Sequence, residues 1–211
     1  MQQSIVSRPM VYVLDDDASI RHSVERLVRS VGLEVRSFPS ASEFLRGGPT
    51  ERPSCFVVDV RMPGLSGLDL LGELTTSERA APMVFITGHG TIPMSVRAMR
   101  DGAVNFLQKP FEDQELLDSI RQAIERGTRA REDQDRHLKV ERRLASLTPR
   151  EREVFSLIVT GLANKQIASR LGTTEKTIKV HRARVMQKME AASLAALVRM
   201  AFELGMVTTA D

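Results

Sequence analysis

Side chains that bind metal ions and phosphoryl groups follow the short apolar runs in the first 127 residues. The acidic segment Asp15–Asp17 comes after one run, and Asp59 ends another. A hydroxyl, Thr87, and an ammonium, Lys109, follow two more runs. Crowded carboxylates repel unless a cation lies among them, and Mg²⁺ prefers one or two carboxylates with waters and a phosphate oxygen. Because an ionised carboxylate attacks phosphorus without a general base, these residues predict a Mg²⁺-dependent aspartyl-phosphate site with Asp59 as nucleophile.

Five short apolar runs, with helical patterns between them, predict how these side chains are positioned. The runs are too short for buried helices and contain β-branched or aromatic residues, as strands covered on both faces do. They are Met10–Leu14, Glu34–Phe38, Cys55–Val58, Met83–Ile86 and Val104–Leu107. Five strand-then-helix units with right-handed crossovers predict an α/β fold, an open, doubly wound parallel sheet. Because ligands bind outside the carboxyl ends of such strands, the reactive groups are expected to meet at one edge.

The overall composition is that of a globular protein with two domains. The chain has 211 residues, of which 42% are hydrophobic and 27% charged, and two domains of about 100 residues each bury a workable core. Its one cysteine, Cys55, lies in an apolar run and is assigned to core packing. No apolar stretch approaches the roughly 18 residues of a membrane span. We therefore expect a cytoplasmic protein without a membrane partner.

Charge is divided unevenly along the chain. Residues 1–128 hold 14 Lys and Arg against 17 Asp and Glu, a net charge of −3, whereas residues 147–211 hold 10 against 6, a net charge of +4. An acidic front half joined to a basic back half predicts a different partner for each, with a polyanion for the back half.

Residues 126–146, between these halves, form a mixed-charge run with few apolar members. One interpretation is a helix that continues from the preceding helical pattern. The seam of 3/4-spaced positions is polar in its middle, which argues against a stable two-stranded coiled coil. The favoured interpretation is a solvated helical or loose linker.

Four helices are predicted in the back half. Thr148, Pro149 and Glu151 supply a cap, a proline at the first helical position and a capping box for the first. The others are expected over Asn164–Leu171, from Thr174 to about Met189, and from a cap at Ser193. Four helices in about 60 residues, the middle two joined by a tight glycine-containing turn, are typical of a helix-turn-helix.

The third of these helices carries a stripe suited to the major groove of DNA. Its members recur at the spacing of one helix face and are Lys176, Lys179, Val180, Ala183 and Arg184. Lysine can donate to guanine and valine can contact a thymine methyl, so Lys176, Lys179 and Val180 are expected at base edges. Residues better placed for phosphates, which add affinity without sequence information, are Lys165, Arg182, Arg184 and Lys188. The alternative is an ordinary solvated basic face.

The front half resembles the receiver domain of bacterial two-component response regulators. The resemblance rests on Asp15-Asp16 after the first strand, Asp59-Val-Arg-Met-Pro-Gly-Leu-Ser-Gly, Thr87 after the fourth strand and Lys109-Pro110 after the fifth. It implies the flavodoxin-like strand order 2-1-3-4-5. It also implies that Asp59 is the phospho-acceptor.

The resemblance further implies a set of ligands for Mg²⁺. Asp16 and Asp59, with the backbone carbonyl of Arg61, would bind the ion, and Asp15 would support it through water. Asp17 is better interpreted as an N-cap for the following helix than as a ligand.

Three residues would report the phosphoryl group. By resemblance, Thr87 and Lys109 would contact its oxygens, and Phe106 stands where the family places an aromatic residue whose rotamer follows phosphorylation. Because this residue is Phe rather than Tyr, a hydroxyl-mediated form of the switch is excluded. In the family the Lys-Pro bond, here Lys109-Pro110, is usually cis.

The back half resembles the LuxR-type DNA-binding domain. The matching segments are Leu147-Thr-Pro-Arg-Glu-Arg-Glu-Val, Gly161-Leu-Ala-Asn-Lys-Gln-Ile-Ala, Leu171-Gly and Thr174-Glu-Lys-Thr-Ile-Lys-Val-His-Arg. The whole chain is therefore similar to a NarL/FixJ-type response regulator, with a receiver over residues 9–127, a linker over 128–143 and a LuxR-type domain over 144–208. Ala183 stands where some relatives carry a base-contacting lysine, so their operator sequence cannot be carried over.

These resemblances imply a transcriptional regulator rather than an enzyme. A histidine kinase would phosphorylate Asp59, and the change would reach the face Ile92–Leu107, where active receivers pair as homodimers on double-stranded operator DNA. Masking of the third helix by the unphosphorylated receiver is a second possibility.

Two competing hypotheses remain. A Mg²⁺-dependent phosphohydrolase with an aspartyl-phosphate intermediate would need a general acid and a substrate pocket, and the sequence suggests neither. A binding module insensitive to phosphate is disfavoured by the intact Asp16, Asp59, Thr87 and Lys109.

Overall fold

The computed structural model describes residues 9–47, 54–75 and 81–206. The chain divides into two compact units between Arg131 and Glu132. The last two residues of the predicted DNA-binding domain, 207 and 208, lie outside the described residues.

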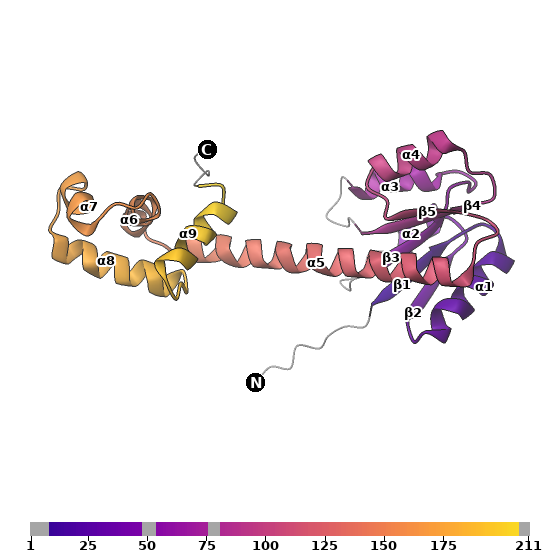
Figure 1. Ribbon diagram of the computed structural model, residues 1–211, viewed down its shortest axis with the longest axis horizontal. Coiled ribbons are helices and arrows are strands. Elements are labelled where there is room, and N and C mark those ends of the chain that lie inside the picture. Colours follow the sequence, from indigo (N-terminus) through magenta and orange to yellow (C-terminus); the bar gives the residue numbers. More distant parts are fainter. Residues whose placement is uncertain (1–8, 48–53, 76–80, 207–211) are drawn as a thin grey trace. The chain divides into compact units, whose positions relative to one another are not determined.

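The first unit is built on a five-stranded parallel sheet, which confirms the predicted fold class (Figure 1). Its strands are β1 (Met10–Leu14), β2 (Glu34–Phe38), β3 (Ser54–Asp59), β4 (Met83–Thr87) and β5 (Asn105–Gln108). They lie in the order β2-β1-β3-β4-β5, as the resemblance implied. Leu14 is opposite Val58 in the register, and Thr87 is opposite Gln108. The strands therefore end at the same edge, where their following residues meet.

Helices cover both faces of this sheet (Figure 1). On one face pack α2 (Ala41–Gly47), α3 (Gly67–Thr75) and α4 (Ile92–Arg100), and on the other α1 (Ala18–Ser30) and α5 (Asp113–Ala145). Glycines follow two of these helices: Gly32 follows α1 and Gly102 follows α4, with positive φ angles of 77° and 100°. These angles suit glycine, which has no Cβ to clash.

The two faces of the sheet have different cores. One contains an aromatic cluster in which Tyr12 stacks on Phe56, with ring centroids 5.3 Å apart, and contacts Phe38 and Phe44. The other is mostly aliphatic and includes Cys55, which is 0% exposed. Burial raises the pKa of the Cys55 thiol, because the charged thiolate would lose its hydration.

The helix α5 is 33 residues long and includes the whole segment expected to be a linker. Near its end, Val140 is 3% exposed and belongs to the apolar core of the second unit. Residues of the expected linker are thus helical, and one of them is a core residue.

The second unit adds four helices after α5, in agreement with the predicted helix-turn-helix pattern. They are α6 (Pro149–Val159), α7 (Asn164–Arg170), α8 (Glu175–Lys188) and α9 (Leu194–Glu203). Thr148 accepts from the backbone N–H of Glu151, whose side chain bonds back to the cap, so the predicted capping box is confirmed. Their shared core includes Phe155, Ile167 and Ile178, each 0% exposed.

In the part of the chain that the structure describes, no helix is both long and apolar enough to cross a membrane.

Candidate functional sites

Three carboxylates meet at the carboxyl edge of the sheet, as predicted. Asp15 and Asp16 follow β1, Asp59 ends β3, and one oxygen from each lies within 4.8 Å of the others. Asp15 is 0% and Asp59 7% exposed, whereas Asp16 is exposed. The set consists of hard oxygen donors with both buried and solvent-facing members. This chemistry fits Mg²⁺, which binds carboxylates and keeps several waters.

Lys109 lies among these carboxylates and supplies their counter-charge. Its Nζ donates to Oδ2 of Asp15 and to Oδ2 of Asp59, at 2.6 Å in both cases. Its backbone N–H donates to the carbonyl of Thr87 at 2.8 Å, which fixes the chain after β5, and the following Lys109-Pro110 bond is cis, as the resemblance implied. The carboxylate edge therefore contains a cation supplied by the chain itself.

The pKa values of these groups follow from burial and from the pair of hydrogen bonds. Burial raises the pKa of Asp15, and hydrogen bonds from Lys109 and from the backbone of Asp17 only partly oppose this. Burial alone would lower the pKa of Lys109, but its bonds to Asp15 and Asp59 outweigh that effect and raise it. Lys109 is therefore a permanent ammonium at neutral pH.

The acidic loop after β1 is held by two residues of α1. Asp17 caps the helix, accepting from the backbone N–H of Ser19 at 2.7 Å, which confirms its predicted role. Nη1 of Arg21 donates to the carbonyls of Asp15 and Asp16 at 2.7 and 3.0 Å. The sequence reasoning did not find Arg21, since an arginine in a first helical turn carries no local signal of such a contact.

The loop after β3 approaches Asp59 closely. The backbone N–H of Arg61 donates to Oδ1 of Asp59 at 2.9 Å and so orients its carboxylate. A Cβ on Gly67, the first residue of α3, would lie only 2.5 Å from the carbonyl oxygen of Asp59. Only glycine fits at position 67 without moving the end of β3.

Thr87 and Phe106, the predicted reporters of phosphorylation, are linked through Gly90. Thr87 is 1% exposed, and its Oγ1 accepts from the backbone N–H of His89 at 3.3 Å. A Cβ on Gly90 would lie 3.0 Å from the methyl carbon of Thr87 and 2.9 Å from the ring of Phe106. Phe106 is half-buried against Phe85, with ring centroids 6.4 Å apart. Thr87 and Phe106 therefore both flank Gly90, which gives a movement of Thr87 a short route to the ring of Phe106.

A pocket of about 380 Å³ opens beside the carboxylates. Its lining residues come from the loops after β3 and β4 and from the end of β5 and are Arg61, Gly88, His89, Gly90, Thr91 and Gln108. Arg61 lies two residues after Asp59 in the chain, and Gly88 directly follows Thr87.

In the second unit, α8 has one buried face and one exposed face. Ile178, Val185 and Met189 are each 0% exposed and face the core. On the other side Val180 is 47% exposed, and the side chain of Lys179 is 67% exposed with only an i,i+4 pair to Glu175 at 3.7 Å. The remaining exposed members of the predicted DNA-binding set are Lys176 and Arg184 on α8 and Lys165 on α7.

Two predicted phosphate contacts are engaged within the protein. Nζ of Lys188 donates to Oε2 of the buried Glu151 at 2.6 Å and to the carbonyl of Ser146 at 3.2 Å. The Lys188 bond, helped by the backbone N–H of Thr148, lowers the pKa of Glu151 to about 2. These contacts join the carboxyl end of α8 to the start of α6.

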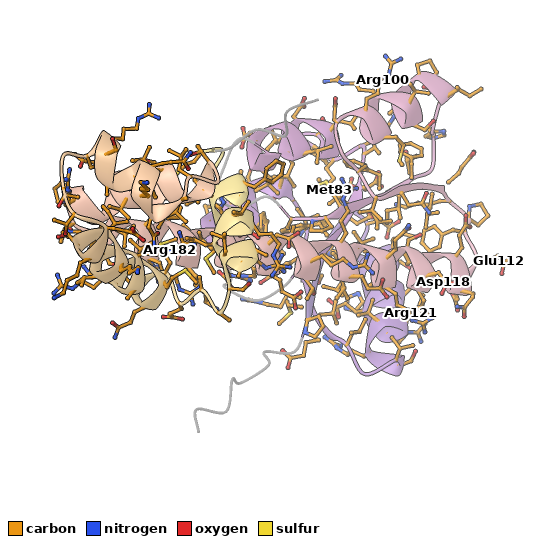
Figure 2. The ribbon with its side chains drawn as sticks, turned by 60° about the vertical axis from the view of Figure 1, so that its left-hand side comes forward. Met83, Arg100, Glu112, Asp118, Arg121 and Arg182 are labelled. Atoms are coloured by element: carbon orange, nitrogen blue, oxygen red, sulfur yellow. The ribbon has the colours of Figure 1, made fainter. Side chains whose placement is uncertain are left out.

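Arg182 is the second of these residues and lies on α8, where Figure 2 labels it. Its Nη1 donates to Oδ1 of Asn164, at the start of α7, at 3.3 Å. The turn between α7 and α8 is held in addition by Arg150, whose Nη2 donates to the carbonyl of Leu171 at 2.7 Å. The sequence reasoning missed Arg150, because its partner lies 21 positions further along the chain, just past the end of α7.

Two family models match the chain. The response regulator receiver domain matches residues 11–121, and the luxR family of bacterial regulatory proteins matches residues 145–201. The first match covers the carboxylate edge and the second covers α6 to α8 and most of α9.

Similar proteins match almost the whole chain. Nodulation protein W of Bradyrhizobium diazoefficiens is 51% identical over 94% of this chain and 88% of its own length. Transcriptional regulatory protein FixJ of Azorhizobium caulinodans is 44% identical over 95% of both. The solved structure of the response regulator StyR covers 93% of this chain and 100% of its own, with 47% identity and a TM-score of 0.85.

Proposed function

The chain belongs to the response regulators that join a receiver domain to a LuxR-type DNA-binding domain, a family of transcriptional regulators, and on this premise we propose which residues carry its activity. Asp59 accepts the phosphoryl group. The observation that supports this assignment is the position of its carboxylate at the end of β3, where it accepts from Lys109 and lies within 4.8 Å of the other two aspartates.

Burial distinguishes Asp59 from its two neighbours. Asp15 is fully buried, so its carboxylate is the harder one for a phosphoryl donor to reach. Asp16 is exposed, and no hydrogen bond of its carboxylate orients it among the described residues. Asp59 alone combines partial exposure with a carboxylate that is oriented on both oxygens, by the N–H of Arg61 and by Lys109.

The same edge would hold Mg²⁺. Asp16 and Asp59, with the carbonyl of Arg61, are the ligands we assign, and Asp15 supports the ion through water. When bound, the ion would neutralise charge on the phosphoryl oxygens. Arg21 holds the carbonyls of Asp15 and Asp16, which keeps both carboxylates at the strand end.

The phosphoryl transfer needs no general base. A carboxylate oxygen of Asp59 attacks the phosphorus of a phosphohistidine in the partner kinase, the new O–P bond forms as the P–N bond breaks, and the imidazole leaves with the electron pair. Lys109 then changes partners, because the oxygen to which it donates has become part of an acyl phosphate. Its ammonium follows the phosphoryl oxygens while it keeps Asp15 as a counter-ion.

The added charge is then passed on by packing. The hydroxyl of Thr87 is free to donate to a phosphoryl oxygen, because in the present structure its oxygen only accepts a bond. A shift of Thr87 changes the space beside Gly90, into which the ring of Phe106 is packed. The face formed by α4 and β5, residues 92–107, is therefore reshaped, and we assign homodimer formation to it.

The second unit reads double-stranded DNA through α8. Lys176, Lys179 and Val180 are exposed and are assigned to base edges. Phosphate contacts are assigned to Lys165, Arg182, Arg184 and Lys188. Arg182 and Lys188 would have to share or exchange their present partners, Asn164 and Glu151, on binding.

We retain as proposals the domain ranges 9–127, 128–143 and 144–208. We also propose a location in the cytoplasm, where a DNA-binding protein meets its operator. The buried Val140 argues for an earlier start of the DNA-binding domain than residue 144.

One experiment tests the acceptor and the output together. The full chain is incubated with acetyl phosphate and Mg²⁺ and examined by intact mass, and its binding to genomic DNA fragments is measured before and after. We expect a gain of one phosphoryl group and tighter binding. Asp59→Asn should lose both, whereas Asp69→Asn, an exposed aspartate of α3, should retain both.

Two results would overturn the proposal. Labelling of Asp59→Asn at the wild-type rate would mean that another residue is the acceptor. Turnover of phosphomonoesters by the wild-type chain would instead favour the phosphohydrolase hypothesis.

A further inference from the structure

Six helices in the described part of the chain end with the same pair of hydrogen bonds. In each, a residue just past the helix donates three residues back, and the next residue donates five residues back. This closure requires a positive φ at the first of the two, for which glycine is favoured. In α1, α4, α6, α7 and α9 that residue is a glycine: Gly32, Gly102, Gly161, Gly172 and Gly205.

The helix α8 is the exception. Its closing residue is Glu190, with φ of 51°, the one non-glycine residue with positive φ among the described residues. Its N–H donates to Gln187 at 3.0 Å, and that of Ala191 donates to Met186 at 3.0 Å. A left-handed conformation is unfavourable for a residue with a Cβ and persists where the surroundings impose it. A glutamate at this position therefore calls for an interaction of its side chain that glycine could not make.

The carboxylate of Glu190 pairs with the guanidinium of Arg143, in the last turn of α5. The two residues are separated by 47 positions in the chain. A second contact lies at the same two helix ends: Lys188 donates to the carbonyl of Ser146 at 3.2 Å. Val140, one turn earlier in α5, is buried in the core of the second unit. The end of α5 is thus fastened to the carboxyl end of α8.

We propose that Glu190 and Arg143 are positioning residues, which hold the carboxyl end of α8 against the last turn of α5 and so set the angle at which α8 meets DNA. The inference rests on the proposed function of α8. Their side chains are 67% and 27% exposed, and such pairs add little to stability. The pair therefore acts on the discrimination between DNA sequences rather than on folding.

The test uses the full chain and two duplexes. One is selected from a random-sequence library by the wild-type protein, and the other has mixed sequence. The measured quantity is the ratio of the two affinities. We expect Glu190→Gln and Arg143→Gln each to lower this ratio about threefold or more. The double variant should lower the ratio no further than either single variant does. The exchanged pair, Arg143→Glu with Glu190→Arg, should restore the wild-type ratio.

Charge alone predicts a different pattern. Removal of a carboxylate near DNA strengthens binding to both duplexes, and removal of a guanidinium weakens it, with little change in the ratio. Glu203→Gln, an exposed glutamate of α9 without an ion pair in the described part, serves as the charge control and should leave the ratio unchanged.

Glu190→Gly separates positioning from stability. Glycine relieves the unfavourable φ, so the Tm should not fall, while the ion pair is lost and the ratio should still decrease. An unchanged ratio in Glu190→Gln and Glu190→Gly would overturn the positioning role while leaving DNA binding by α8 intact. If the wild-type chain enriches no duplex, the proposed function fails, and this inference fails with it.

Discussion

The Nζ atom of Lys109 lies 2.6 Å from Oδ2 of Asp59, the residue proposed to accept the phosphoryl group. The same nitrogen is bonded equally closely to Asp15, so a single ammonium bridges two carboxylates. A divalent cation bound by these carboxylates would have to share their oxygens with Lys109.

Replacement of Lys109 by methionine should make the fold depend on Mg²⁺. Without the ammonium, the buried Asp15 loses its counter-charge, and the free energy of unfolding in EDTA is expected to fall by up to about 3 kcal/mol. Thermal unfolding followed by circular dichroism should then show a larger rise in Tm on addition of Mg²⁺ than in the wild type. Lys139→Met, at an exposed position of α5, provides the control. If Mg²⁺ raised the Tm of the wild type, Lys109→Met and Lys139→Met by the same amount, competition between Lys109 and Mg²⁺ would be contradicted.

The Glu151–Lys188 pair predicts how stability varies with pH. The pKa of Glu151 is lowered from 4.5 to about 2 in the folded chain, so the folded state binds this proton less readily than the unfolded state does. The stabilisation is complete above pH 4.5 and is lost as the pH falls toward 2.

Urea unfolding at a series of pH values checks this. Glu151→Gln should be less stable than the wild type at neutral pH, and the difference should shrink in acid. Glu153→Gln, on the exposed side of the same helix, should show no comparable pH dependence. A constant difference between Glu151→Gln and the wild type at all pH values would show that the charge of Glu151 is not responsible.

Gly67→Ala should disturb the acceptor, since the new methyl group would meet the carbonyl of Asp59. Backbone cannot move aside as a flexible side chain can, so we expect a loss of about 2 kcal/mol in unfolding free energy and slower labelling by acetyl phosphate. The matched substitution in the same helix, Gly72→Ala, meets no atom within 4 Å and should raise stability by about 0.5–1 kcal/mol. Similar effects of the two would rule out the close approach as the cause.

Lys179→Ala should relax sequence discrimination. An exposed lysine that donates to a base contributes about 1–3 kcal/mol on the preferred site and little elsewhere. Competition binding with duplexes altered one position at a time should locate the position that Lys179 reads. Lys165→Ala, a proposed phosphate contact, should weaken all duplexes alike, and the same uniform loss in Lys179→Ala would reassign that residue to phosphate.

Much of the fold follows from local pattern. Strands buried on both faces must be apolar throughout. The apolar runs at Met10–Leu14 and Met83–Ile86 therefore identified β1 and β4. Helix caps are similarly local, because Asp17 and Thr148 bond within three residues of themselves. The convergence of Asp15, Asp59 and Lys109 was also predictable, since parallel strands end together.

Contacts between distant side chains were not predictable in this way. Lys109 reaches carboxylates 50 and 94 positions away, and Lys188 reaches Glu151 across 37 positions, so no spacing in the sequence signals either pair. From the sequence alone, Lys188 could not be distinguished from the other lysines assigned to DNA. Glu190 was missed for another reason. The residue that closes a helix with a positive φ is usually a glycine or an asparagine, so a glutamate gives no signal of this role.

The burial of Cys55 has a practical consequence for all these measurements. Thiol reagents attack the thiolate, and here that form is both suppressed and out of reach. Because the chain has no second cysteine, a new one at an exposed site such as Ala183 would be the sole target for a spin label or fluorophore. Spectroscopic probes can therefore be attached to the exposed face of α8 while the native core is left untouched.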